Sequence, residues 1–205
     1  MPESARGVFG IERLPLAERY AASLATDGVV RGLIGPREVP RLWDRHLLNC
    51  AVMTEAVPRD VTLADIGSGA GLPGLVLAIA RPDVQVTLIE PLLRRTTYLD
   101  EVVETFGLEN VTVVRGRADE VHGRQQFDVV TSRAVAALDK LARWSMPLVR
   151  RRGELLVMKG GRAQEEIDGA RTMLKKWSDR PAEVVQVGAG VVDPPTTLVR
   201  VVRTR

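Results

Sequence analysis

The feature that most constrains the fold of this chain is an alternation of short apolar runs with longer amphipathic segments between residues 62 and 202. The apolar runs have the length of buried strands, and the segments between them repeat apolar residues at helical spacing. Strands separated by helices are expected to pair in parallel, because a parallel return needs a crossover connection and a helix supplies it. The predicted strands of this parallel part span residues 62–66, 84–89, 111–114, 127–131 and 154–158.

The N-terminal part of the chain departs from this alternation. Amphipathic patterns predict helices over residues 14–24 and 41–57, the second ending before Pro58. A segment rich in loop-forming residues, 28–40, lies between them. We therefore expect residues 1–57 to form a helical extension.

The C-terminal part departs from the alternation in another way. Apolar runs at 184–187 and 197–202 flank a loop without a helical pattern, which predicts an antiparallel pair at one edge of the sheet. Parallel strands closed by such a pair describe the Rossmann-like fold of class I methyltransferases better than a plain dinucleotide-binding domain. The sequence therefore predicts an α/β fold with a mostly parallel sheet and an antiparallel edge strand, formed by one compact domain over 58–205.

A glycine-rich turn joins the first predicted strand to the helix that follows it. Residues 65–74 read Asp-Ile-Gly-Ser-Gly-Ala-Gly-Leu-Pro-Gly. Glycines at such a turn let the backbone pass close to a ligand and adopt positive φ angles. Pro73 suits the first turn of a helix, where its missing N–H would have no partner. This turn is predicted to bind a ligand.

Two ligand classes fit parts of this turn. Residues 69–74 satisfy the G-x-G-x-x-G dinucleotide pattern, and Glu90 follows at the end of the second strand, where it can accept hydrogen bonds from ribose hydroxyls. Gly67 and the acidic Asp65 favour S-adenosylmethionine, because a carboxylate repels a pyrophosphate and attracts an ammonium or a sulfonium. Acidic-x-G-x-G-x-G is typical of class I methyltransferases. The pattern predicts cofactor contacts at Asp65, Gly67, Gly69, Gly71 and Glu90.

The residues that the chain lacks exclude some classes of methyl acceptor. Methylation of a pyrimidine carbon needs a cysteine nucleophile, and Cys50 lies outside the sheet motifs. The turn after the fourth strand, within 127–134, has neither the prolines nor the aromatic residue usual for methylation of an adenine amine. It carries Arg133 instead, which suits an acceptor that needs no deprotonation, such as N7 of guanine.

Several motifs together resemble the RsmG family (glucose-inhibited division protein B), whose members methylate N7 of a guanine in 16S ribosomal RNA. The resemblance extends from about residue 41 to the C-terminus. It implies S-adenosylmethionine as cofactor, and 16S ribosomal RNA or the small ribosomal subunit as partner. It rests on residues 45–48, 67–74, 94–95, 117–120, 132–134 and 158–160.

The resemblance also implies roles for single residues. It places cofactor contacts at Gly67, Leu72, Ala118, Asp119 and Arg133. The family pattern is not complete, because Asp119 stands where the family usually has glutamate, and the usual N-terminal Asn-Leu-Thr stretch has no clear counterpart.

Substrate contacts are expected from four further residues. Lys159 ends the fifth strand on the ligand side of the sheet and is a candidate for positioning the substrate. Arg41, Arg45 and His46 belong to the second predicted helix and are candidates for RNA contact. The two histidines, His46 and His122, have no metal-ligand pattern around them, so no metal is expected.

Composition and charge indicate what kind of protein the chain forms and which partners it can bind. With 45% hydrophobic and 27% charged residues, a folded globular protein is expected. No secretory leader or membrane span is recognisable and there is one cysteine, so we expect a cytoplasmic protein. A monomer is the default expectation for its oligomeric state. The net charge is +3, but basic residues cluster, notably at 150–152, 175–176 and 200–205, which permits a polyanionic partner.

Three other functions stay open at this point. The chain could be a class I methyltransferase that acts on a protein or a small molecule, which would not bind RNA in a salt-sensitive way. It could be an NAD-dependent oxidoreductase, although no acid–base pair is recognisable. It could also be an RNA-binding module without activity, which the intact glycine turn disfavours.

Overall fold

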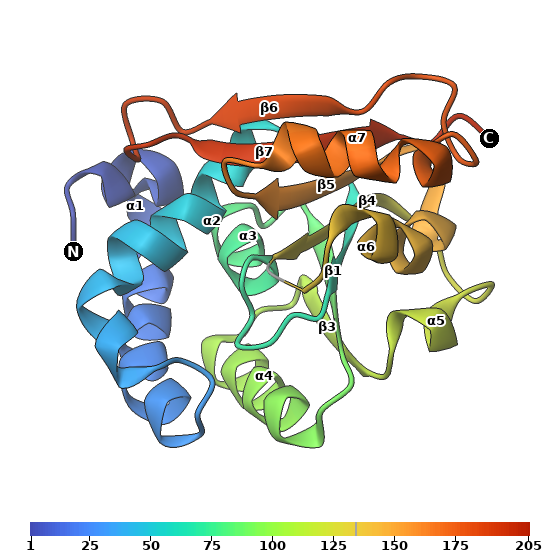
Figure 1. The fold of residues 1–205 in the computed structure, drawn as a ribbon. Helices are drawn as coiled ribbons and strands as arrows, with labels where there is room; N and C mark the ends of the chain where they lie inside the picture. The colour runs from blue at the N-terminus through green and yellow to red at the C-terminus, as the bar shows by residue number, and fades with distance from the viewer. Residues whose placement is uncertain (134) are drawn as a thin grey trace.

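The computed structural model describes residues 1–133 and 135–205, and it contains one seven-stranded sheet with helices on both faces (Figure 1). The strand order is β3-β2-β1-β4-β5-β7-β6. Neighbouring strands from β3 to β5 pair in parallel, whereas β7 is antiparallel to both β5 and β6. The strands are β1 (Thr62–Ile66), β2 (Gln85–Glu90), β3 (Val111–Arg115), β4 (Phe127–Arg133), β5 (Val149–Lys159), β6 (Glu183–Val187) and β7 (Thr196–Val202).

This arrangement confirms the predicted fold class. A parallel sheet whose chain runs outward from β1 to β3, and then returns to β4 and β5, has its switch point between β1 and β4. Ligands of such sheets bind outside the carboxyl ends of the strands near that point. The antiparallel pair β6–β7 forms the predicted edge.

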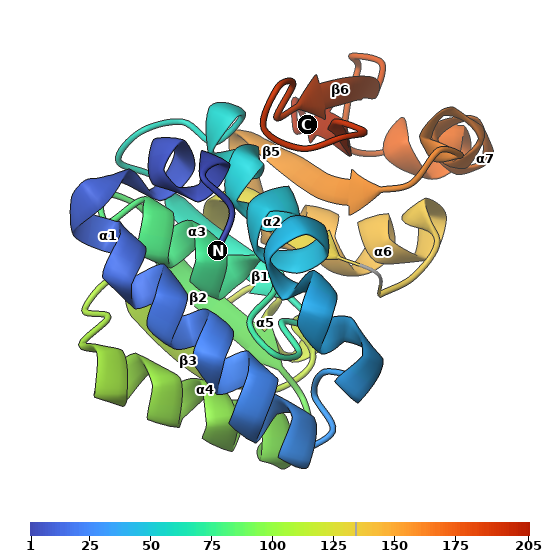
Figure 2. The same ribbon diagram turned by 90° about the vertical axis from the view of Figure 1, so that its left-hand side faces the viewer.

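Helices cover both faces of the sheet, as the side-on view shows (Figure 2). Inward-facing residues alternate along each strand, so Leu63 and Leu88 belong to one hydrophobic core while Ala64 and Ile89 belong to the other. One face is covered by α1 (Ser4–Ser23), α2 (Asn49–Ala51), α3 (Gly74–Ala80) and α4 (Leu93–Phe106), the other by α5 (Ala118–Val121), α6 (Leu138–Ser145) and α7 (Ala163–Leu174).

The N-terminal extension differs in detail from the prediction. Helix α1 begins ten residues earlier, since Ala5 and Phe9 bury one face of this additional turn, and it is broken at Gly10, where φ is +70°. The segment predicted as a single helix over 41–57 changes its winding along its length. It consists of η3 (Leu42–Leu48), a π-helix, then α2, then η4 (Val52–Glu55), a 3₁₀-helix, and it is preceded by the 3₁₀-helix η2 (Pro36–Arg41).

Strand β5 is also longer than predicted. It begins at Val149, which pairs with Phe127, and the register then shifts before Val129 pairs with Glu154. Arg152 lies in this irregular stretch with φ at +67°. Three consecutive arginines interrupt the apolar pattern, so the first residues of this strand could not be recognised from the sequence.

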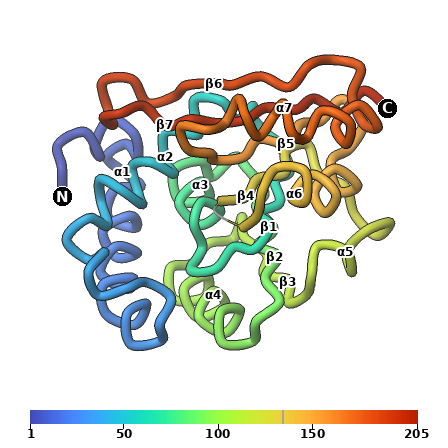
Figure 3. Tube along the Cα trace, in the orientation of Figure 1, coloured from blue at the N-terminus to red at the C-terminus, as the bar shows by residue number. Residues whose placement is uncertain are grey.

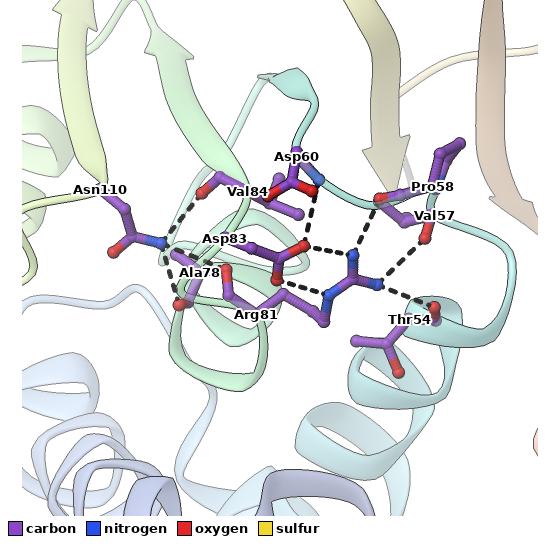
Figure 4. Close-up of polar contacts among 9 residues, drawn as sticks. All are labelled: Thr54, Val57, Pro58, Asp60, Ala78, Arg81, Asp83, Val84 and Asn110. Carbon is purple, nitrogen blue, oxygen red and sulfur yellow. Dashed lines mark hydrogen bonds and ion pairs between the residues drawn. The ribbon is translucent and has the colours of Figure 1, made fainter.

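Arg81 fastens the extension to the start of the sheet (Figure 4). Its guanidinium donates to the backbone carbonyls of Thr54, Val57 and Pro58 at 3.4, 3.0 and 2.9 Å, and it forms a two-pronged ion pair with Asp83. The close-up shows the guanidinium enclosed between these groups. The end of the extension is therefore held by a partly buried, hydrogen-bonded cation.

Within residues 1–133 and 135–205, no helix is both long enough and apolar enough to cross a bilayer.

Candidate active site

A cavity of about 640 Å³ lies at the carboxyl ends of the parallel strands. Strands β1, β2 and β4 end at Ile66, Glu90 and Arg133, and all three residues face this cavity. The predicted residues Gly67, Gly69, Leu72, Glu90, Ala118, Asp119 and Arg133 all line it, together with His46, Arg95, Arg117 and Trp144.

The glycine turn forms one wall of the cavity, and its backbone needs glycine at two points. Gly67 has φ at +68°, and a Cβ atom there would lie 2.8 Å from a methyl group of Val135. Gly71 has φ at +99°, and its Cβ would lie 2.4 Å from Leu75. Gly71 does not line the cavity, so its observed role is to shape the turn.

Asp65 is fully buried and does not line the cavity. One carboxylate oxygen accepts the backbone N–H of Gly74 at 2.9 Å, at the first residue of α3, while its other oxygen has no hydrogen-bond partner among the described residues. Burial raises the pKa of Asp65 to about 7. The structure thus places this acid behind the glycine turn, where it ties the end of β1 to the start of α3.

Glu90 is 1% exposed and faces the cavity. Its carboxylate accepts the backbone N–H groups of Gly69 at 3.0 Å and Leu92 at 3.1 Å, and it pairs with Arg95 at 3.3 Å. These contacts fix the carboxylate at the end of β2 against the glycine turn. A buried, oriented acid at this position can accept hydrogen bonds from a pair of hydroxyl groups.

The opposite end of the cavity is formed by the turn that follows β3. Ala118 and Asp119 begin α5, and Asp119 accepts a hydrogen bond from the Arg117 guanidinium at 3.1 Å. This ion pair holds the pKa of Asp119 below its usual range. Trp144 of α6 also lines this cavity.

Arg133 is held by the extension through a line of hydrogen bonds. Its guanidinium donates to Nδ1 of His46 at 2.7 Å and to Sγ of Cys50 at 3.3 Å. Because Nδ1 of His46 accepts, the proton of the neutral ring sits on Nε2, which donates to Glu38 at 2.7 Å. Burial, opposed by Glu38 and reinforced by Arg133, lowers the pKa of His46.

Cys50 therefore lies close to the site, contrary to what its sequence position suggested. It is fully buried, and burial raises the pKa of its thiol. A buried thiol with a raised pKa is a poor nucleophile, so its observed role is to accept the hydrogen bond from Arg133.

A second cavity, of about 890 Å³, adjoins the first. Arg133 and Val135 line both, so they form the wall between them. Lys159 lines the second cavity, where its ammonium donates to the carbonyl of Ala136 and to Glu166, both at 2.8 Å. Arg45, Asn49, Arg162 and Glu165 complete the polar part of the lining.

The remaining predicted residues are placed as follows. Arg45 is exposed, pairs with Glu38 at 3.4 Å and lines the second cavity. Arg41 is exposed at the end of η2 and lines neither cavity. His46 points towards Arg133 rather than towards solvent. Ala134, the last residue of the predicted stretch 132–134, lies outside the described residues.

Sequence reasoning missed several residues of the site. Glu38 contacts His46, Arg95 contacts Glu90, and Leu33 and Ile34 of the extension line the first cavity. A repeat of apolar residues indicates burial, but it does not indicate which distant residue a side chain contacts. The only sequence feature that pointed to these contacts was the Arg-His pair at 45–46.

The residues present fit S-adenosylmethionine. The cavity volume is in the range of about 300–1,000 Å³ that small-ligand pockets occupy. It combines a buried carboxylate at Glu90 with a guanidinium at Arg133, and a glycine at position 67 where a side chain would clash. Fold and site together define the class of this protein, which is that of the class I S-adenosylmethionine-dependent methyltransferases.

Comparisons with known proteins agree with this class. The solved O-methyltransferase TomG from Streptomyces achromogenes, in complex with S-adenosylmethionine, has a TM-score of 0.62 at 17% identity and covers 100% of both chains. A predicted O-methyltransferase from Agrobacterium tumefaciens has a TM-score of 0.59 at 19% identity, over 78% of this chain and 81% of that one. These similarities show the fold.

The sequence comparisons identify the family. The family model described as rRNA small subunit methyltransferase G matches residues 13–192. The ribosomal RNA small subunit methyltransferase G of a Nocardioides species is 60% identical over 98% of this chain and 81% of its own length. The protein with that name in Thermobifida fusca is 58% identical over 98% and 85%. The chain belongs to the rRNA small subunit methyltransferase G family, as the motifs predicted.

Proposed function

We propose that this protein transfers the methyl group of S-adenosylmethionine to N7 of a guanine in 16S ribosomal RNA. The observation that carries the proposal is the position of Arg133, in the wall between a cavity that suits the cofactor and a second, larger cavity. The family to which the chain belongs supports the RNA substrate.

The residues proposed to hold the cofactor line the first cavity. Glu90 binds the ribose hydroxyls, Asp119 and the backbone at Ala118 meet the adenine, and Arg133 binds the carboxylate. The glycine turn, with Gly67, Gly69 and Leu72, forms the remaining wall. Asp65 and Gly71 act behind the turn and shape it. When bound, the cofactor supplies a methyl group on a sulfonium.

The second cavity is proposed to receive the guanine. N7 of guanine carries a lone pair and needs no base to remove a proton, and alignment is then the main task of the protein. Lys159 is fixed by Glu166, so we propose that it shapes the acceptor cavity and presents a positive charge there. Arg45 and Arg162 lie at its edge, where they can pair with phosphates. Arg41 is proposed to contact RNA further out.

His46 is reassigned in this proposal. Its ring is 8% exposed and faces Arg133, so it positions that arginine instead of binding RNA. We further propose that the protein acts as a monomer in the cytoplasm, where ribosomal RNA is present.

Methyl transfer tests the proposal directly. The protein is incubated with labelled S-adenosylmethionine and with naked 16S RNA, 30S subunits or 70S ribosomes, and the labelled nucleoside is identified and mapped. We expect 7-methylguanine at one position in at least one of these substrates. Absence of label from all three, or label in a ribosomal protein, would overturn the proposal.

A matched pair of variants connects the result to the site. Arg133→Met is expected to abolish transfer, whereas Arg59→Met, which changes an exposed arginine outside both cavities, is expected to leave it unchanged.

A further inference from the structure

The basic clusters of the C-terminal third come together at one end of the molecule. The start of β5, the end of α7 and the residues after β7 meet there, beside the chain end marked C in Figures 1 and 3. Arg152 donates its backbone N–H to the carbonyl of Arg203, and Arg203 donates to Gly153, both at 2.8 Å. The backbone N–H of Arg205 donates to the carbonyl of Trp177 at 3.1 Å. We call the cations of these segments, at 150–152, 175–176, 180, 203 and 205, the basic end.

The basic end concentrates the positive charge of the protein. It contains eight arginines and lysines, and the acids that pair with them are Asp128, on Arg150, and Asp179, on Arg205. The net charge of this group exceeds the +3 of the whole chain, so the remaining residues are net negative. A patch of one sign on a chain of opposite remaining charge produces a directed field that attracts polyanions.

Five of these cations are exposed and form no ion pair within the described part of the chain. They are Arg151, Arg152, Lys175, Lys176 and Arg180. Arg203 is the scaffold beneath them. It stacks on the Trp177 ring at 4.7 Å and donates to the carbonyls of Met146 and Val149.

One of these five cations, Arg152, adopts a strained backbone conformation. Arg152 has φ at +67°, a region that costs a side chain with a Cβ atom and that glycine occupies freely. The neighbouring Gly153 does not have a positive φ. Strain at a charged, exposed residue is typical of a position kept for binding, because the fold alone would be better served by glycine.

The basic end is separate from the two cavities. Lys159, at the last position of β5, lines the second cavity, whereas Arg150 to Arg152 lie near the first positions of this strand. Val149 and Met158 pair with Phe127 and Arg133 of β4, so β5 covers about 20 Å of the sheet between these two pairs. The basic end therefore belongs to a different surface, and a substrate that touches both must be at least this long.

We propose that the basic end is a second RNA-binding surface, which holds the phosphate backbone of the ribosomal RNA about 20 Å from the methylated base. Six of its eight cations are arginines, whose planar guanidinium matches a phosphate in two-pronged hydrogen bonds. The surface contributes affinity without reading sequence, since phosphate contacts position a protein on its RNA. The proposal rests on the proposed RNA substrate.

Binding of 16S RNA, measured without cofactor over a series of salt concentrations, tests this surface. The variant Arg151→Gln/Lys175→Gln/Lys176→Gln is compared with Arg6→Gln/Arg13→Gln/Arg19→Gln, which removes the same charge from α1 on the opposite face. We expect the first variant to lose about ten-fold or more in affinity at low salt, and its slope of log affinity against log salt to become shallower by about two. The α1 variant should match the natural protein in slope.

The single variant Arg152→Gly separates binding from folding. Glycine relieves the positive φ, so the unfolding temperature should stay the same or rise, while the RNA affinity falls and the salt slope decreases by about one. A merely structural arginine at this position would give no loss of RNA affinity.

The outcomes distinguish this inference from the proposed function. Equal affinities and slopes for the basic-end variant and the natural protein would overturn the second surface, even if the variant lost binding to an acidic protein. An equal loss in the α1 variant would overturn it too. Normal RNA binding by the natural protein without methyl transfer would contradict the proposed function and leave the second surface standing.

Discussion

Asp65 is an acidic residue whose burial disfavours its charged form. It is fully buried, one of its oxygens has no partner among the described residues, and its pKa is raised to about 7. An acid at this point of the sequence pattern suggested direct contact with a cationic cofactor. In the structure it lies one layer further in, with the glycine turn between it and the cavity.

The raised pKa of Asp65 predicts a pH dependence of stability. Between about pH 4 and 7 the folded protein keeps a proton that the unfolded chain has released, so the free energy of unfolding falls as the pH rises. This residue alone contributes up to about 1.4 kcal/mol per pH unit in that window. We expect Asp65→Asn, which does not titrate, to lose this contribution. Urea unfolding at pH 5, 6, 7 and 8 measures it, and parallel curves for the two proteins would contradict it.

His46 predicts the opposite sign of pH dependence for the site. Its pKa is lowered, so a neutral ring is stable in the fold at neutral pH, and protonation as the pH falls makes Nδ1 unable to accept from Arg133. Methyl transfer should therefore fall on the acid side of the ordinary histidine pKa. His46→Gln can accept from Arg133 and donate to Glu38 without titrating, so it should retain activity and lose this fall.

His46→Ala is the matched control for that variant. It removes both hydrogen bonds, and about ten-fold weaker cofactor binding is expected at pH 7.5, because Arg133 loses its support. Titration calorimetry with S-adenosylmethionine across pH 5.5–8 measures the cofactor affinity of both variants, and methyl transfer is assayed over the same range. A loss of methyl transfer at low pH that persists in His46→Gln would exclude His46 as the group responsible.

At the scale of elements, the glycine turn is a rigid joint between β1 and α3. A Cβ atom at Gly74 would lie 2.4 Å from Leu88 and 2.7 Å from the Asp65 carboxylate, whereas at Gly69 the nearest atom is 3.8 Å away. The two glycines of one turn thus have different reasons to be glycine. At Gly74 the neighbouring atoms leave no room for a side chain, whereas Gly69 needs glycine only because its φ is +60°.

This difference predicts unequal costs for alanine. Gly74→Ala should destabilise the protein by about 2–3 kcal/mol because it overpacks the joint, and Gly69→Ala by about 1 kcal/mol through backbone strain alone. Chemical denaturation of both variants gives the two values. Equal costs would mean that Asp65 and Leu88 can move aside.

The elements were predictable where a local pattern decides them. The five parallel strands and the antiparallel edge follow from runs of apolar residues and from the missing helix between β6 and β7. The windings between Leu42 and Glu55 could not be predicted, because a continuous helical pattern does not reveal where packing tightens or widens a turn. The start of β5 was not predicted for another reason. Three arginines interrupt its apolar pattern, and Val149 alone pairs with β4 before the register shifts.

The candidate site divides in the same way. The glycine turn and Glu90 follow from spacing within one βαβ unit. The partners of Arg133 are separated from it by more than 80 residues, so only the folded chain brings them together. Lys159 was correctly expected at a strand end, but its ion pair with Glu166 depends on how α7 packs back onto the sheet.

At the scale of the whole molecule, Arg81 holds the extension to the sheet. The variant Arg81→Met leaves three backbone carbonyls without this donor, so we expect a loss of about 2–3 kcal/mol in stability. Arg59→Met, in the same region but exposed, should cost less than about 0.5 kcal/mol.

Asp83 adds a pH signature to that prediction. Arg81 holds the pKa of Asp83 well below its usual range, so this pair stabilises the fold above about pH 4 and loses that contribution as the pH falls. The deficit of Arg81→Met should therefore shrink in acid. Thermal unfolding at pH 7 and at a series of values down to about pH 2 measures the change, because the contribution is lost only as the pH approaches the lowered pKa of Asp83. A deficit that stays constant over this range would show that the ion pair contributes little.

The line of hydrogen bonds from Glu38 through His46 to Arg133 has a consequence for modular engineering and for descent. The sheet and the extension are each contiguous in sequence. Arg133 belongs to the sheet, but the residues that position it, His46 and Glu38, belong to the extension. A chimera that joins residues 58–205 to the N-terminal helices of another methyltransferase would keep only the sheet side of its cofactor cavity, and it would leave that arginine without its two side-chain acceptors. The inherited unit is thus the pair of blocks, and natural exchange of either one alone is expected to have been selected against.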